Sequence, residues 1–200
     1  MTQATARQAT AGRGRLTPER EAELYEHVIA LVREHGYDSL TMDAVAARAH
    51  VSKATLYRQW REGKPELVAS AMRHTKPLPY EGIDTGSLRG DLFALADAGT
   101  DLEDDTVFMS AVMHAVQTNE DLGAALRAML VEPMRRVLEQ VIDRAVERGE
   151  VRAGAAAGRF LAHALVGALP ARKILDDTFA DPEYMKAYVD AVVLPALLNS

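Results

Sequence analysis

Two short helical patterns separated by a tight turn lie between Thr41 and Trp60, and they restrict the fold more than any other part of the sequence. The first pattern follows Thr41, a good N-cap, and its apolar residues recur at helical spacing. These residues are Met42, Val45, Ala46 and Ala49. The second pattern follows Ser52, another good N-cap, and places Leu56 and Trp60 on one helical face. A short helix, a tight turn and a second helix form the layout of a helix-turn-helix.

The rest of the chain also has helical spacing, and no segment has the alternating pattern of a strand. A first helix is expected to follow the N-cap Thr17 and to end at Gly36. Asn119 and Asp181 are expected to cap later helices. After the helix-turn-helix, six helices are predicted, over about Pro65–Thr75, Leu88–Gly99, Val107–Val116, Asn119–Gly149 with a bend at Pro133, Ala155–Asp176 with a kink at Pro170, and Pro182–Leu198. The sequence therefore predicts an all-α protein of about nine helices.

The charge of the chain is divided unequally. Residues 1–76 carry 12 Lys and Arg against 9 Asp and Glu, whereas residues 77–200 carry 11 against 20. A polyanion would bind the first part and be repelled by the second. We expect a disordered, arginine-containing arm over residues 1–15, a DNA-binding domain over 16–76 with its helix-turn-helix at 41–60, a boundary loop over 77–86 and a helical domain over 87–200.

Polar side chains on the outward face of the second short helix suit a DNA major groove. Lys53 can donate to guanine or phosphate, Ala54 allows close approach, and Thr55 offers a hydroxyl group and a methyl group for thymine. Further contacts, to phosphates or a minor groove, are expected from Thr41, Tyr57, Arg58, Arg13 and Arg15. The alternative is that these residues form the solvated face of a small helical bundle.

The stretch LTMDAVAARAHVSKATLYRQW closely resembles the helix-turn-helix of the tetracycline-repressor (TetR) family, and the match runs from about Leu16 to Met72. The resemblance implies DNA contacts at the positions named above and a phosphate contact at Lys64. His50 stands where the family usually has glycine, so we expect a positive φ there. One extra residue precedes Lys64, which makes Arg61 the alternative phosphate contact.

For residues 87–200 the resemblance implies a dimer formed by the last two helices and a cavity for a small-molecule inducer. Methionine-rich linings adapt to varied apolar ligands, and histidines could orient them. The candidate cavity residues are Phe93, Phe108, Met109, Met113, His114, Met129, Met134, Phe160 and His163. Ordinary core packing is the alternative for each of them.

The predicted function is that of a homodimeric repressor released from a near-palindromic operator by a small apolar or aromatic molecule. A DNA-binding regulator without an inducer, acting by occupancy or through a protein partner, is the alternative.

Several function classes lack support in the sequence. Cysteine is absent, and no apolar run reaches the roughly 18 residues of a membrane span. The N-terminal residues lack the apolar segment of a secretory signal, so we expect a cytoplasmic protein. No phosphate-binding loop, dinucleotide-binding turn, paired-histidine metal motif or nucleophile motif occurs. We therefore expect no enzymatic activity, no cofactor and no metal.

Overall fold

The computed structural model describes residues 16–75, 82–99 and 106–200, and its secondary structure there is helical, as predicted. Four helices form the N-terminal part: α1 (Pro18–Ser39), α2 (Met42–Arg48), α3 (Lys53–Gln59) and α4 (Lys64–Thr75). The helices that follow are α5 (Leu88–Gly99), α6 (Thr106–Val116), α7 (Glu120–Leu126), α8 (Glu132–Glu147), α9 (Leu161–Asp176), α10 (Pro182–Tyr188) and α11 (Leu194–Leu198). Two π-helical segments join α7 to α8 and α10 to α11. With each joined pair taken as one helix, the described residues contain nine helices, as expected.

Helix starts follow the predicted capping residues. The side chains of Thr17, Thr41, Ser52, Asn119 and Asp181 each accept a hydrogen bond from the backbone N–H three residues later. These bonds satisfy donors that the first turn of a helix leaves unpaired. The five predicted N-caps are therefore confirmed.

Glycines interrupt the helices where a left-handed backbone is required. Gly36 has φ 78° and ψ 164°, which kinks α1 three residues before its end. Gly149 has φ 74° directly after the C-cap of α8. The predicted stop at Gly149 is confirmed, whereas Gly36 kinks α1 and the helix continues to Ser39. Glycine suits both positions because it adopts positive φ without the steric cost that a Cβ atom imposes.

Prolines explain the two π-helical segments. Pro133 has no N–H to bond the carbonyl of Met129, and the segment Arg127–Val131 widens just before it. The predicted bend at Pro133 thus takes the form of a π-helical turn. Pro195 follows the second segment, Val189–Val193, in the same way, although the sequence pattern had predicted one uninterrupted helix there.

The predicted start of a helix at Ala155 is wrong. Residues 152–157 form turns, a short 3-10 turn covers Gly158–Phe160, and α9 begins at Leu161. Gly154 has φ 74°, and the N-cap residue Ala157 makes no side-chain capping hydrogen bond to the turn that follows it. The alanine run therefore had apolar content but no helix start signal.

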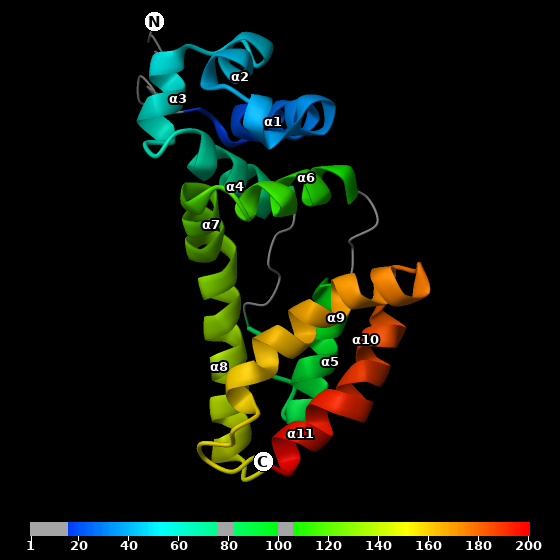
Figure 1. Ribbon diagram of the computed structural model, residues 1–200. Helices are drawn as coiled ribbons and strands as arrows, with labels where there is room; N and C mark the ends of the chain where they lie inside the picture. Colours follow the sequence, from blue (N-terminus) through cyan, green and yellow to red (C-terminus); the bar gives the residue numbers. More distant parts are fainter. Residues whose placement is uncertain (1–15, 76–81, 100–105) are drawn as a thin grey trace, which may run out of the picture.

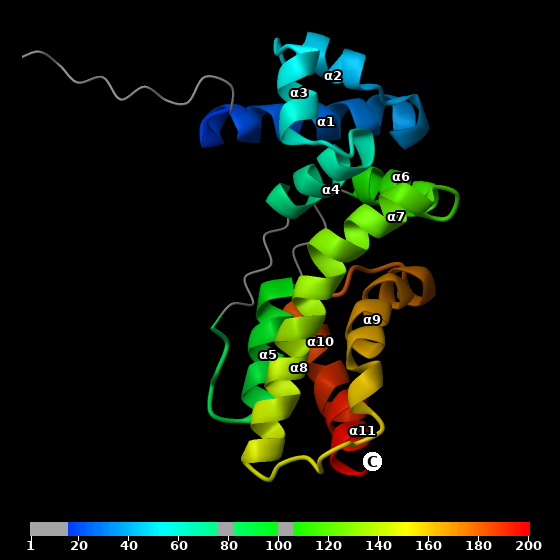
Figure 2. The same ribbon diagram turned by 90° about the vertical axis from the view of Figure 1, so that its left-hand side faces the viewer.

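Two large hydrophobic clusters hold the helices together (Figures 1 and 2). The first joins α1 to α4 with α6 and α7, and Phe108 and Val112 of α6 are buried in it. The second joins α5, α8, α9 and the C-terminal helices. The connected segment α7–α8 runs from one cluster to the other. The apolar face of α6 therefore packs with the N-terminal helices, mainly on α1, although its residues fall within the predicted second domain.

Candidate nucleic-acid interface

Helix α3 is anchored by two buried side chains. Leu56 is fully buried, and Trp60 at its C-terminal end is 3% exposed. The Trp60 ring meets Tyr25 of α1 edge to face, with ring centroids 5.8 Å apart. This anchoring turns Lys53, Ala54, Tyr57 and Arg58 toward solvent, at the end of the molecule opposite the C-terminus (Figure 1). The predicted outward face of α3 is therefore exposed.

Thr55 differs from its neighbours on α3. Its side chain is half-buried, and its hydroxyl group lies 2.9 Å from that of the N-cap Ser52. The hydroxyl group is therefore occupied within the cap, while Thr41, at the start of α2, is exposed. Arg13 and Arg15 lie outside the described residues.

Lys53 is paired within the protein. Its Nζ lies 2.6 Å from Oδ2 of Asp43, a residue in the first turn of α2. Both side chains are more than half exposed. No pattern in the sequence indicated this contact, because it depends on how the turn from Ala49 to Ser52 folds α3 back against α2.

The turn between α2 and α3 depends on His50. His50 has φ 52°, as predicted, and its side chain is exposed. Its N–H donates to the carbonyl of Ala47 at 3.4 Å, and the N–H of Val51 donates to that of Ala46 at 3.0 Å. These bonds close the end of α2 in the way that a C-terminal glycine normally does.

Lys64 lies at the start of α4 and points toward the end of α1. Its Nζ donates to the carbonyls of Tyr37 at 3.2 Å and Asp38 at 3.4 Å. The same ammonium lies 4.3 Å from the centroid of the Tyr37 ring. Arg61, the alternative phosphate contact, is exposed. Through these contacts Lys64 connects the start of α4 to the end of α1.

The nine candidate cavity residues do not form one cluster. Phe108 is buried in the first hydrophobic cluster, and Met109 and Met129 pack half-buried against it. Phe93 and Met134 pack half-buried against the second cluster. The remaining four are exposed: Met113, His114, Phe160 and His163. Phe160 and His163 contact each other edge to face.

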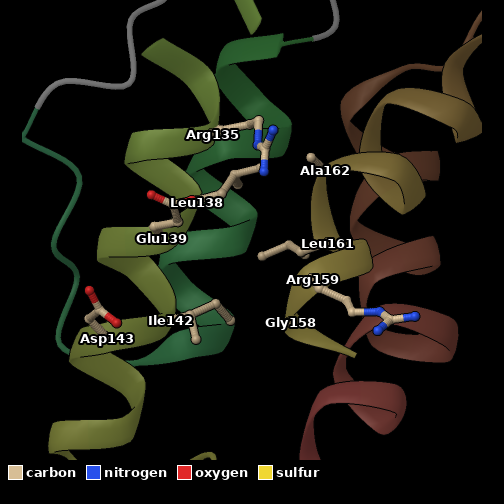
Figure 3. Close-up of a pocket in the computed structure, with 9 residues that line it drawn as sticks. All are labelled: Arg135, Leu138, Glu139, Ile142, Asp143, Gly158, Arg159, Leu161 and Ala162. Atoms are coloured by element: carbon tan, nitrogen blue, oxygen red, sulfur yellow. The ribbon is translucent and has the colours of Figure 1, made fainter. Parts of the chain in front are cut away.

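The described residues line a groove and a smaller cleft. A groove of about 670 Å³ lies between residues 35–39 of α1 and α6, and His114 is the one candidate cavity residue along it. A cleft of about 140 Å³ lies between α8 and α9 (Figure 3). There Leu138 and Ile142 point toward Leu161, while the carboxylates of Glu139 and Asp143 lie on the side away from α9. Ligand pockets usually measure about 300 to 1,000 Å³, so the cleft is too small for most ligands.

Two family models match the chain. Residues 29–71 match the model described as bacterial regulatory proteins of the tetR family. Residues 83–192, more than half of the chain, match the model described as tetracyclin repressor-like, C-terminal domain. The chain belongs to the TetR family. It is therefore a DNA-binding transcriptional regulator.

Relatives of this TetR-family regulator support the assignment. It is 35% identical over 189 residues to an uncharacterised helix-turn-helix transcriptional regulator of Mycobacterium tuberculosis, covering 90% of this chain and 89% of that protein. It is 35% identical over 118 residues to a DNA-binding transcriptional repressor of Mycobacteroides abscessus, covering 57% of this chain and 61% of that protein. The crystal structure of a TetR-family transcription regulator has a TM-score of 0.61 and 29% identity, covering 89% and 98% of the two chains.

One contact joins α4 of the TetR-family regulator to the segment before α8 without any signal in the sequence pattern. The Ser70 hydroxyl group donates to the Met129 sulfur at 3.9 Å, although 59 residues separate the two positions. Only the burial of Leu67, Val68 and Ala71 around Ser70 indicates that this face of α4 packs on another helix.

Every helix within residues 16–75, 82–99 and 106–200 is too short or too polar to cross a membrane.

Proposed function

We propose that this regulator is a homodimeric repressor that a small apolar or aromatic molecule releases from a near-palindromic operator. The observation that carries the proposal is the exposed face of α3, held outward by the buried Leu56 and Trp60. An exposed helix of this kind can enter a major groove with its first residues at base edges. Repression is also the activity named for the Mycobacteroides abscessus relative. Because the partner is DNA, the proposed place of action is the cytoplasm.

The proposed DNA contacts divide between bases and phosphates. Lys53 and Ala54 lie at the first turn of α3 and would face base edges, with the Thr55 methyl group beside them. Tyr57, Arg58 and Thr41 would contact phosphates, and Arg13 and Arg15 would reach the minor groove. Arg61 is better placed than Lys64 for a further phosphate, since Lys64 already donates to two carbonyls.

Exposed apolar residues on the last helices favour a homodimer. Ile174 and Leu175 of α9 are 79% and 80% exposed. Further exposed apolar side chains of this C-terminal region are Phe160, Val166, Val192 and Leu198. A second copy of the chain would remove these side chains from water. Two-fold symmetry would then place two α3 helices on one side of the DNA, about one duplex turn apart or slightly more.

The proposed inducer would act through Met129. Met129 lies within the π-helical segment, Met134 lies in the first turn of α8, and the two pack on different hydrophobic clusters. A ligand that displaced Met129 would disturb its contact with Ser70 of α4. Helix α4 is also bonded to α1 through Lys64, so its movement would change the position of α3. An effect of 5- to 150-fold on DNA affinity would need about 1 to 3 kcal/mol of preferential binding to the released state.

Selection of binding sites from a random duplex library tests the DNA-binding part of the proposal. We expect enrichment of an inverted repeat, and a library without any enriched repeat would contradict the proposed operator binding.

A thermal-shift screen of apolar and aromatic compounds then tests the inducer. A stabilising compound should weaken binding to the selected duplex, and Met129→Ala and Met134→Ala should reduce that response. Met113→Ala, at an exposed methionine, is the matched control. Compounds that bind without changing DNA affinity would favour a regulator without an inducer.

A further inference from the structure

The ion pair between Lys53 and Asp43 lies at the proposed DNA-contacting surface. Lys53 is the first residue of α3, and Asp43 is in the first turn of α2. Their charged atoms are 2.6 Å apart, and their side chains are 59% and 63% exposed. An anion this exposed could separate from its partner without moving any buried group. The pair is therefore available for exchange with another charged molecule.

Charge at this surface depends strongly on Asp43. The cation at the other end of α2, Arg48, makes a bidentate pair with Glu34 of α1, at 2.6 and 2.7 Å. Asp43 likewise neutralises Lys53 and places a negative charge beside the start of α3. A DNA phosphate brought to this position would meet a carboxylate as well as an ammonium. Binding through phosphates alone should therefore be weakened.

A G·C base pair offers complementary groups for both members of the ion pair. In the major groove guanine presents two acceptors, O6 and N7, and the paired cytosine presents its N4–H donor. An ammonium beside a carboxylate matches this arrangement, with Lys53 donating to guanine and Asp43 accepting from cytosine. A run of phosphates offers acceptors only, and it leaves the carboxylate opposed by negative charge.

We propose that Asp43 is a specificity-determining residue that holds Lys53 until the DNA presents both an acceptor and a donor. This inference rests on the proposed role of Lys53 in base contact. On random DNA the carboxylate competes with phosphates for the ammonium. On the operator the Asp43 carboxylate accepts a hydrogen bond from cytosine when Lys53 turns to guanine. Separation of the ion pair therefore costs less there than on random DNA.

The test compares Asp43→Asn with the wild-type protein on two duplexes, a random-sequence duplex and the duplex selected from the library. Asparagine keeps the size of the side chain and removes its charge. On the random duplex we expect about three- to fivefold tighter binding, the range of an exposed charge interaction. The log–log dependence on salt should steepen by about 0.9, corresponding to one more phosphate neutralised. The selected duplex should gain less, so that the affinity ratio of selected to random DNA falls.

Two controls separate this role from a general change in charge. Glu34→Gln removes one negative charge from another exposed ion pair, whose cation is Arg48, and should change the affinity ratio little. In a Lys53→Gln background the gain from Asp43→Asn should disappear. An equal gain in that background, or an equal effect of Glu34→Gln, would overturn the proposal. Failure of the wild-type protein to bind either duplex would instead contradict the proposed DNA-binding function. Circular dichroism melts check that each variant is folded at the assay temperature.

Discussion

The ammonium of Lys64 caps the C-terminal end of α1 by donating to the carbonyl of Tyr37 at 3.2 Å. It also lies over the ring of Tyr37, which is almost fully buried. A cation at this end of a helix interacts favourably with the helix dipole. The bond from Lys64 adds to the one that the Tyr37 carbonyl already accepts from the N–H of Leu40. Burial raises the pKa of Tyr37 to about 12, with the nearby carboxylates of Asp121 and Asp38 adding to the effect. The Tyr37 ring is therefore a neutral surface for the cation at physiological pH.

Replacement of Lys64 by methionine tests this cap. Lys64→Met keeps most of the side-chain volume and removes the hydrogen bonds to α1. We expect the free energy of unfolding to fall by about 1 kcal/mol, measured by urea denaturation. Arg61→Met, at the exposed neighbouring position, should stay within about 0.5 kcal/mol of wild type. Unchanged stability together with weaker DNA binding would show that Lys64 binds phosphate instead.

Replacement of His50 by glycine should stabilise the protein. His50 has φ 52°, and a left-handed backbone costs a residue with a Cβ atom about 1 to 2 kcal/mol. Because glycine also gains entropy in the unfolded chain, we expect a net gain of about 0.5 to 1 kcal/mol in thermal unfolding. Gly149→Ala is the reverse control, since its φ is 74° and an added Cβ would meet nothing within 4 Å. Loss of DNA affinity in His50→Gly would assign the imidazole a contact with DNA.

Replacement of Tyr57 by alanine should weaken DNA binding without unfolding the protein. The side chain is 51% exposed, so the free energy of unfolding should change by less than about 1 kcal/mol. Fluorescence anisotropy with the selected duplex measures the loss of affinity. Tyr57→Phe separates the hydroxyl group from the ring, because it removes only the group proposed to contact phosphate. A large loss of thermal stability in Tyr57→Ala would assign the ring a structural role.

Replacement of Ile174 by aspartate should dissociate the proposed dimer. The Ile174 side chain is 79% exposed in the single chain, and a buried aspartate in a symmetric interface would lack a partner. We expect sedimentation velocity to show a monomer, with DNA affinity reduced because two half-sites are no longer bound together. Val107→Asp, at a 59% exposed position on α6, is the control and should remain a dimer. Dissociation of both variants to the same extent would argue against an interface centred on the last helices.

Asp91 predicts a loss of stability in acid. Burial by itself would raise the pKa of Asp91, but the N–H and hydroxyl groups of Thr85 and the Arg144 guanidinium together lower it below the ordinary value. A carboxyl group with a lowered pKa in the folded state stabilises the protein above its unfolded pKa of about 4, and this contribution falls as the pH drops toward the folded pKa. Asp91→Asn should therefore cost about 3 kcal/mol at neutral pH and progressively less below about pH 4. Urea unfolding across this range measures the difference, and the exposed Asp143→Asn should show little of it.

Prediction from the sequence succeeded where a structural feature depends on nearby residues. The N-caps at Thr41 and Ser52 need a hydrogen bond across three residues, and the positive φ at His50 follows from its place after a short helix. The same local signals gave a wrong helix start at Ala155, where the sequence is apolar but has no capping residue. They also did not predict the π-helical segment before Pro195. Local patterns thus establish most helices and the outward residues of α3.

The sequence by itself determined an all-α chain, the helix-turn-helix and the residues that this motif exposes, because capping, periodicity and turns act over a few neighbouring positions. Only the tertiary structure decided that Lys53 meets Asp43, that Lys64 caps α1 and that Ser70 contacts Met129. Those partners are 10, 27 and 59 residues apart. The same holds for α6, which packs on α1 in the N-terminal cluster. Such contacts depend on how whole helices pack, because a helix determines which of its side chains share a face but not which helix covers that face.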